Sequence, residues 1–216
     1  AAWHPNHIAY RQAVLRGAYL HGEAFSAAKP YSTVWSAWGV ANDRPQIDDL
    51  VHRYLWTYIT EHPHSRQSHF YYNTWGMQRD NTNRVGLRDI FTESRILTEI
   101  KNAAELGVDL FVLDDGWEQK QGEWKPHTTR LPQGLAPLVA AMQAKKIIPG
   151  IWLSPMGIDS TAARYRTLQH LVIKDKFGQP IKAQWDHPAF DFVSSFKDSL
   201  VADCKWLIDQ GIRFFK

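Results

Sequence analysis

The 216-residue sequence lacks the marks of several common protein classes. Cys204 is the single cysteine, which excludes an internal disulfide. No apolar run approaches the roughly 18 residues that a membrane-spanning helix needs. Basic residues exceed acidic ones by only three and are scattered along the chain. We therefore expect neither a membrane span nor a nucleic-acid partner.

Two further absences narrow the kinds of site to consider. No G-x-G-x-x-G turn follows an apolar run, which argues against a nucleotide-binding sheet. The histidines His127, His170 and His187 do not have the spacing of metal ligands. We therefore expect no metal and no cofactor.

Tryptophan, in contrast, is abundant. The chain has ten tryptophans and an apolar fraction of 44%, which predicts a buried core. Aromatic faces stack on sugar rings, but large aromatic residues are also common in cores. The tryptophans alone are thus only a weak indication of a carbohydrate ligand.

The pattern of apolar residues divides the chain into three parts. Residues 1–40 alternate as strands do around a turn at Gly22, and predict a β-hairpin at the end of a β-sandwich domain. Residues 41–68 predict a linker with one helix, because apolar residues recur there at helical spacing. The residues on that helical face are Ile47, Leu50, Val51, Tyr54 and Leu55.

From residue 69 to 216, short apolar strands alternate with amphipathic helices. Strands are expected at 70–76, 110–116, 147–155 and 211–216. The first helix between them should begin after Thr92 and stop at Gly107. The last helix, 196–210, should turn one apolar face inward: Leu200, Val201, Cys204, Leu207 and Ile208. Such alternation predicts a parallel α/β sheet.

Polar and aromatic residues gather where these strands end. They are Asn73, Trp75, Asp114, Asp115, Ser154 and Lys216. In a (β/α)8 barrel, the carboxyl ends of the strands form the rim that carries the active site, and a complete barrel takes about 250 residues. We therefore predict the first half of a TIM barrel, with strands 1 to 4, in residues 69–216.

The adjacent carboxylates of Asp114 and Asp115 have three interpretations. They could cap a helix or pair with a basic neighbour, and this is a common role for acidic residues after a strand. They could bind calcium or magnesium, although no companion ligands with a recognisable spacing accompany them. They could instead accept hydrogen bonds from sugar hydroxyls, with nearby tryptophans as the apolar wall.

The ordered set of motifs resembles the melibiase-type α-galactosidases. The preceding segment "YLHGEAF" (19–25) is similar to the end of the β-sandwich that precedes the barrel in that family. The most specific element is Asp-Asp-Gly-Trp after an apolar strand, followed by Leu-Pro-x-Gly-Leu. The motifs, in chain order, are "NTW" (73–75), "LFVLDDGW" (110–117), "LPQGLAPL" (131–138), "GIWLSP" (150–155), "VIKDKFGQPI" (172–181) and "GIRFFK" (211–216).

This resemblance implies a retaining α-glycosidase that acts on terminal α-linked galactose. It implies that Asp114 and Asp115 bind sugar hydroxyls, that Trp75 walls the pocket and that Lys216 bonds a ring hydroxyl. The family's nucleophile lies two residues beyond that lysine, and its acid/base residue lies later still. We therefore expect no catalytic residue in this chain, no hydrolysis by the 216 residues alone, and a partner in the remainder of the barrel.

Some residues depart from the family pattern or have two interpretations. Ser154 stands where the family commonly has glutamate. Residues 182–188 lack a family arginine, and two interpretations are open: Trp185 replaces its contact by stacking, or Asp186 and His187 face a different substituent. A core position and a pocket position are equally consistent with the sequence for Trp152, Trp117 and Trp124. The open functional alternatives are a raffinose-synthase-like transglycosidase, a hydrolase of another α-glycoside, and a carbohydrate-binding barrel without catalysis.

Overall fold

A computed structural model describes residues 26–28, 38–60, 62–79 and 86–216 of the chain. The chain divides into two compact units, residues 1–66 and 67–216. The predicted β-hairpin of residues 1–40 lies almost wholly outside the described residues, so the β-sandwich remains a prediction.

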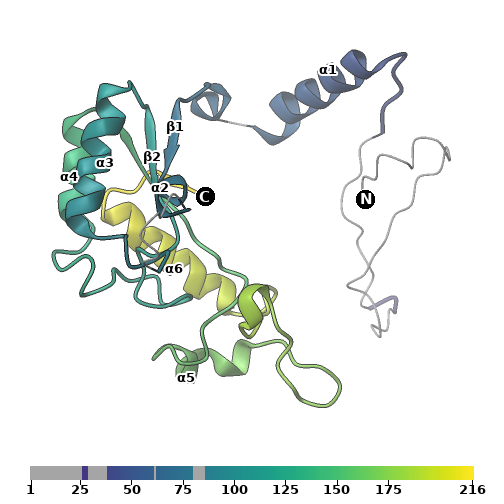
Figure 1. Cartoon of the computed structure of the whole chain (residues 1–216). Helices are drawn as coiled ribbons and strands as arrows, with labels where there is room; N and C mark the ends of the chain where they lie inside the picture. The colour runs from purple at the N-terminus through teal and green to yellow at the C-terminus, as the bar shows by residue number, and fades with distance from the viewer. Residues whose placement is uncertain (1–25, 29–37, 61, 80–85) are drawn as a thin grey trace. The chain divides into compact units, whose positions relative to one another are not determined.

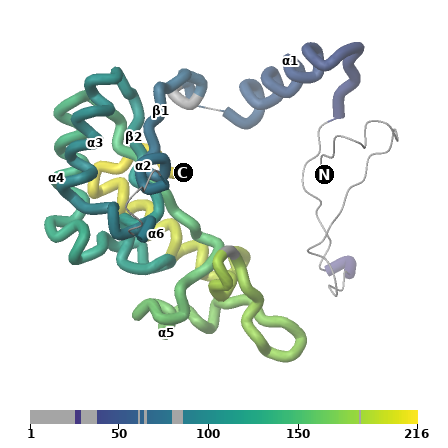
Figure 2. The backbone as a smooth tube through the Cα atoms, viewed as in Figure 1, coloured from purple at the N-terminus to yellow at the C-terminus, as the bar shows by residue number. Residues whose placement is uncertain are grey.

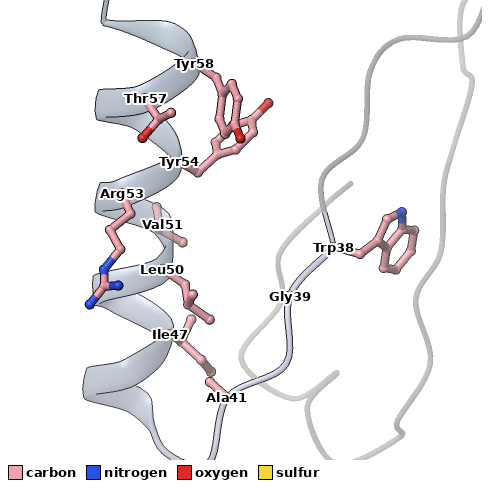
Figure 3. Close-up of a pocket in the computed structure, with 10 residues that line it drawn as sticks. All are labelled: Trp38, Gly39, Ala41, Ile47, Leu50, Val51, Arg53, Tyr54, Thr57 and Tyr58. Carbon is pink, nitrogen blue, oxygen red and sulfur yellow. The ribbon is translucent and has the colours of Figure 1, made fainter.

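The first unit contains the expected helix. Helix α1 (Arg44–Tyr54) begins after Asp43, whose carboxylate accepts a hydrogen bond from the Gln46 amide at 2.9 Å. It continues into a π-helical turn, η3 (Leu55–Ile59), and a 3₁₀ turn, η4 (Pro63–Arg66), follows. The apolar side chains of α1 line an open groove beside segment 38–41 (Figure 3).

The second unit is built on a parallel sheet, as predicted. Its strands are β1 (Tyr71–Asn73), β2 (Leu110–Leu113), β3 (Ile148–Ile151) and β4 (Phe214–Phe215). They are hydrogen-bonded in sequence order, and each neighbouring pair is parallel. This order is what the early strands of a β/α barrel require.

Helices cover one face of this sheet (Figure 1). Helix α3 (Glu93–Glu105) starts at Thr92, whose hydroxyl accepts from the Arg95 amide at 3.4 Å, and stops at Gly107, which has a φ of 75°. Helix α4 (Ala136–Ala144) packs beside α3, and helix α6 (Phe196–Asp209) leads into β4. The Thr92 cap and the Gly107 stop confirm the predicted limits of that helix.

The main core lies between the sheet and these helices. All four residues of β2 are buried, as expected of a strand covered on both faces. Phe111 is fully buried and stacks on Tyr72 with ring centroids 4.8 Å apart. On the opposite face, Gly150 is crowded, since an added Cβ would lie 2.6 Å from a methyl of Val112. The sheet therefore packs tightly on both sides.

The predicted strand limits were too wide, since all four strands are shorter than expected. The strand expected at 70–76 ends at Asn73, and a short helix, α2 (Thr74–Arg79), follows at once. The cause is the Asn73 side-chain oxygen, which accepts from the Trp75 amide at 2.7 Å and turns the chain.

The predicted inward face of α6 was also partly wrong. Phe196 and Leu207 are buried on one side of the helix. Val201 and Ile208 lie about 100–120° around the helix from Leu207 and are exposed.

Residues 156–195 form an excursion with a small core of its own (Figure 2). Phe190 stacks on Phe196, the first residue of α6, at a centroid distance of 3.9 Å. Arg164 makes an ion pair with Asp203 of α6 at 2.6 Å. The short helix α5 (Tyr165–Leu168), the 3₁₀ turns η5 (Gln169–Leu171) and η6 (Gln184–Asp186), and isolated antiparallel bridges make up the rest. The excursion is thus anchored to α6.

We predict that Phe111→Ala lowers the free energy of unfolding by about 3–5 kcal/mol, because it leaves a cavity in the main core. Phe177, at the tip of a hairpin, is 75% exposed and provides the matched control. Phe177→Ala should change stability by less than about 0.5 kcal/mol. Urea denaturation followed by tryptophan fluorescence measures both, and equal losses would contradict this account of the core.

Candidate functional site

The candidate site lies at the carboxyl edge of the sheet. Register pairs Leu113 of β2 with Ile151 of β3, and Ile151 with Phe215 of β4. The residues that follow β2 and β4, Asp114 and Lys216, therefore leave the sheet at the same edge. Asn73, the last residue of β1, lies at this edge too.

Asp114 joins these strand ends. Its Oδ2 accepts from Lys216 Nζ at 2.6 Å and from Asn73 Nδ2 at 2.7 Å. Its Oδ1 accepts from the Asp115 amide at 2.8 Å, and its own amide donates to Thr74 Oγ1 at 2.9 Å. The Asp114 side chain is 5% exposed and that of Lys216 is 42% exposed. The carboxylate is therefore fixed in place, while the ammonium group retains access to the rim.

Asp115 has a different set of partners. Arg88 NH2 lies 2.9 Å from Oδ1 and donates to Oδ2 at 3.1 Å. The Asp115 carbonyl accepts from Gln78 Nε2 at 2.6 Å. Gly116 follows with a φ of 114°, and a Cβ there would meet Gln78, Phe91 and Arg88 at 3.3–3.5 Å. Glycine at this position therefore lets the chain turn sharply, so that the two carboxylates have different neighbours.

A third carboxyl group, Glu118, is buried close to Asp115. Its Oε2 accepts from the Gly116 amide at 3.2 Å. Burial, followed by the negative charge of Asp115, raises the pKa of Glu118 to about 8. Arg130 is also nearby, but its guanidinium donates to the carbonyls of Gly116 and Glu118 at 2.8 and 3.3 Å.

The tryptophans separate into core and surface. Trp117 and Trp124 are buried and belong to the main core, so the pocket interpretation was wrong for both. Trp117 Nε1 donates to the carbonyl of half-buried Trp152 at 2.8 Å. Trp152 meets Trp185 edge to face, with ring centroids 5.8 Å apart. Trp185 is 47% exposed, so it can offer a face to a ligand.

The backbone around Trp185 is strained. Trp185 and Asp186 have φ values of 57° and 60°, a region that costs non-glycine residues energy. They lie in a turn closed by the Ala183 amide donating to the His187 carbonyl at 2.7 Å. The fold thus holds an exposed tryptophan in an unfavourable backbone conformation, a feature common at binding sites.

The structure brings some of the predicted site residues together. Asp114 and Lys216 are in direct contact, and the amide of Trp75 is linked to them through Asn73. Trp152 and Trp185 form a second group through their rings. The sequence did not single out Arg88, which belongs to a loop without a motif, or Glu118, which directly follows the Asp-Asp-Gly-Trp motif. Within the described ranges, no three His, Cys, Asp or Glu side chains are grouped to hold a metal, and no helix is long and apolar enough to cross a membrane.

Comparison with known proteins agrees with this geometry. The sequence pattern of the melibiase family matches residues 50–195. The chain belongs to the melibiase family. This melibiase chain is 29% identical over 133 residues to the bifunctional α-galactosidase/sucrose kinase AgaSK of Mediterraneibacter gnavus, covering 56% of the chain and 14% of AgaSK. It is 25% identical over 181 residues to the Escherichia coli α-galactosidase, covering 76% and 24% respectively.

Solved structures give the same fold. The galactosidase domain of AgaSK matches 69% of this melibiase chain with a TM-score of 0.57 and 26% identity, over 21% of that chain. The α-galactosidase TtGalA of Thermus thermophilus, in complex with stachyose, matches 69% with a TM-score of 0.58 and 21% identity, over 32% of its own chain. The melibiase chain therefore spans between a seventh and a quarter of the two curated relatives described here, and its sheet is similar to α-galactosidase barrel domains.

We predict that Asp114→Ala destabilises the melibiase chain by about 2–3 kcal/mol, because it removes the acceptor of Lys216, Asn73 and the Asp115 amide together. Glu105 provides a control, since its ion pair with Lys101 is long, at 4.0 Å, and exposed. Glu105→Ala should cost less than about 0.5 kcal/mol. Denaturation midpoints report both, and a neutral Asp114→Ala would contradict the bridging role.

Proposed function

We propose that the chain is part of a retaining α-galactosidase and supplies the residues that hold a terminal α-linked galactose. The observation that carries the proposal is the contact of Asp114 with Lys216 and Asn73 at the carboxyl edge of a melibiase barrel sheet. TtGalA was solved in complex with stachyose, which supports a galactoside oligosaccharide as the ligand class.

The chemistry of the site suits sugar hydroxyls. An ionised carboxylate has about four acceptor positions, and Asp114 uses three of them on protein donors. Lys216 spends one ammonium hydrogen on Asp114 and has others to offer at the rim. A hydroxyl both donates and accepts, so it can donate to Asp114 and accept from Lys216 at once. Adjacent hydroxyls would be fixed in a single geometry.

In this proposal, three tryptophans supply the apolar surfaces. Trp75, at the start of α2, lies beside the Asp114 contacts, whereas Trp152 and Trp185 lie on the side of β3 and the excursion. Trp185 is the most exposed of these and would stack on the sugar next to the galactose. In this assignment, the strained turn exposes the ring of Trp185 so that a sugar can stack on it.

The reacting carboxylates would come from outside these 216 residues. A retaining glycosidase needs two carboxyl groups about 5–5.5 Å apart that flank one bond. Asp114 and Asp115 follow one another at a strand end and are each held by a cation, Lys216 or Arg88. We infer that they bind the sugar and that the isolated 216-residue chain does not hydrolyse galactosides.

The proposal is tested on the full-length protein with p-nitrophenyl α-galactoside. Asp114→Asn keeps the shape of the side chain but loses the charge, and kcat/KM should fall at least about a hundredfold. Asp175→Asn, in a hairpin turn where the side chain accepts from two backbone amides, is the control and should keep kcat/KM within about twofold.

Three outcomes would count against this function. If wild type binds galactosides without turnover, it is a carbohydrate-binding barrel. If it transfers galactose to an acceptor sugar in preference to water, it is a transglycosidase. If Asp114→Asn retains full kcat/KM, Asp114 does not hold the sugar.

A second prediction concerns Trp185. Trp185→Ala should raise KM for an α-galactosyl oligosaccharide about five- to tenfold, with little change in kcat, because stacking contributes about 1 kcal/mol to ground and transition states alike. Phe177→Ala removes an aromatic ring from another hairpin that is more exposed, at 75% against 47% for Trp185, and should leave KM unchanged. An unchanged KM in Trp185→Ala would remove Trp185 from the proposed site.

A further inference from the structure

Two buried carboxyl oxygens near the site have no hydrogen-bond partner among the described residues. They are Asp115 Oδ1 and Glu118 Oε1. Both belong to acceptor-only groups when ionised, and the two carboxyl groups are within hydrogen-bonding reach of each other. A single proton between them would satisfy both oxygens.

The neighbouring guanidinium groups donate no hydrogen bond to these two oxygens. Arg88 NH2 lies 2.9 Å from Asp115 Oδ1, but its hydrogen bond goes to Oδ2. Arg130 donates to the carbonyl oxygens of Gly116 and Glu118 rather than to the Glu118 carboxyl group. The Glu118 residue is only 2% exposed, so bulk water does not replace them. Two ionised carboxylates would therefore share one ion pair, that of Arg88.

Two carboxyl groups within hydrogen-bonding reach of each other in a buried site repel when both are ionised, which favours protonation of one of them. Glu118 is the one that gains the proton, because burial and the charge of Asp115 raise its pKa to about 8. Asp115, in contrast, has an ion pair with Arg88. The arrangement is thus an acid–carboxylate pair in which each group has a definite role.

We propose that Glu118 is a positioning residue, protonated at neutral pH, which donates from Oε1 to Asp115 Oδ1 and fixes the Asp115 carboxylate for a sugar hydroxyl. The inference rests on the proposed function, in which Asp115 holds the galactose. Glu118 does not itself touch the sugar. Its second oxygen, held by the Gly116 amide, aligns the hydroxyl with Asp115.

The charged groups that face this pair come from several segments. Arg88 comes from the segment before α3, and Arg130 from the loop before α4. At the strand ends, Lys216 and Asp114 form an ion pair of their own, and Asp114 Oδ1 accepts from the Asp115 amide. His127 has a pKa lowered chiefly by burial, so it is neutral near pH 7. From α2 only the uncharged Gln78 reaches Asp115.

Loss of the proton has a defined consequence. When Glu118 ionises, Oε1 ceases to donate and repels Asp115 Oδ1, and the buried pair carries a second negative charge. The Asp115 carboxylate then loses its fixed orientation. Galactoside affinity should therefore be full below pH 8 and fall as the pH rises through 8.

The test measures the dissociation constant of galactose, which has no glycosidic bond to hydrolyse, for the full-length protein between pH 6 and pH 9.5 by calorimetry. Wild-type affinity should fall about tenfold per pH unit above 8. Glu118→Gln keeps a donor, its amide, but does not titrate, and should remove this alkaline fall. Glu118→Leu provides no donor and should weaken binding about tenfold or more at every pH.

The control is Glu123→Gln, in the same loop, where the carboxylate accepts from the Ala163 amide at 2.7 Å. This variant should retain the alkaline fall of wild type. An alkaline fall that persists in Glu118→Gln would overturn the proposal, and so would wild-type affinity that is constant up to pH 9.5.

A measurement without ligand separates this inference from the proposed function. Infrared difference spectra should show the carbonyl stretch of a protonated carboxyl group at pH 7, absent in Glu118→Gln and lost in wild type above pH 8. Absence of the band at pH 7 would overturn the acid–carboxylate pair whatever the protein binds. If the band is present and no α-galactoside binds, the proposed function fails, and with it the positioning role, while the pair itself is established.

Discussion

The structure of the site depends on one carboxylate, that of Asp114. It accepts from Asn73 at the end of β1 and from Lys216 at the end of β4, although 102 positions separate it from Lys216. This contact is possible only because β1 to β4 are parallel and leave the sheet at the same edge. The carboxylate therefore joins the outer strands of the sheet to its centre. In the proposed function, the same atoms that hold the strand ends also bind the sugar.

Two adjacent aspartates with like charges are stable here because their surroundings differ. Asp114 is neutralised by Lys216 and Asp115 by Arg88, so each buried charge has a cation of its own. Gly116 makes this separation possible with a φ of 114°. Glu118 is then the carboxyl group left without a cation, and burial favours its neutral form. Burial first, and then the charge of Asp115, raise the pKa of Glu118 to about 8.

Sequence patterns predicted the parts that follow from local periodicity and chain direction. The strand order, the Thr92 cap and the gathering of Asp114 and Lys216 were predictable, because apolar runs and parallel connections determine them. The limits of β1 and the buried stripe of α6 were not predictable. The side chain of Asn73 ends β1, and Val201 lies about 120° around the helix from the buried Leu207. Arg88 contacts Asp115 across 27 positions, which no local pattern indicates. Glu118 has close sequence neighbours as partners, but its burial follows from tertiary packing.

Helix α6 connects the two halves of the proposed site. Its first residue, Phe196, stacks on Phe190 and so fixes the excursion that carries Trp185. Its last turn leads through residues 210–213 to β4 and Lys216. A shift of α6 along its axis would therefore move the tryptophan and the lysine together, whereas Asp114 would stay with β2. The ion pair of Asp203 with Arg164 opposes such a shift, because it ties the middle of the helix to the excursion. The packing of α6 thus sets the distance between Asp114 and Trp185, the two sides of the proposed site.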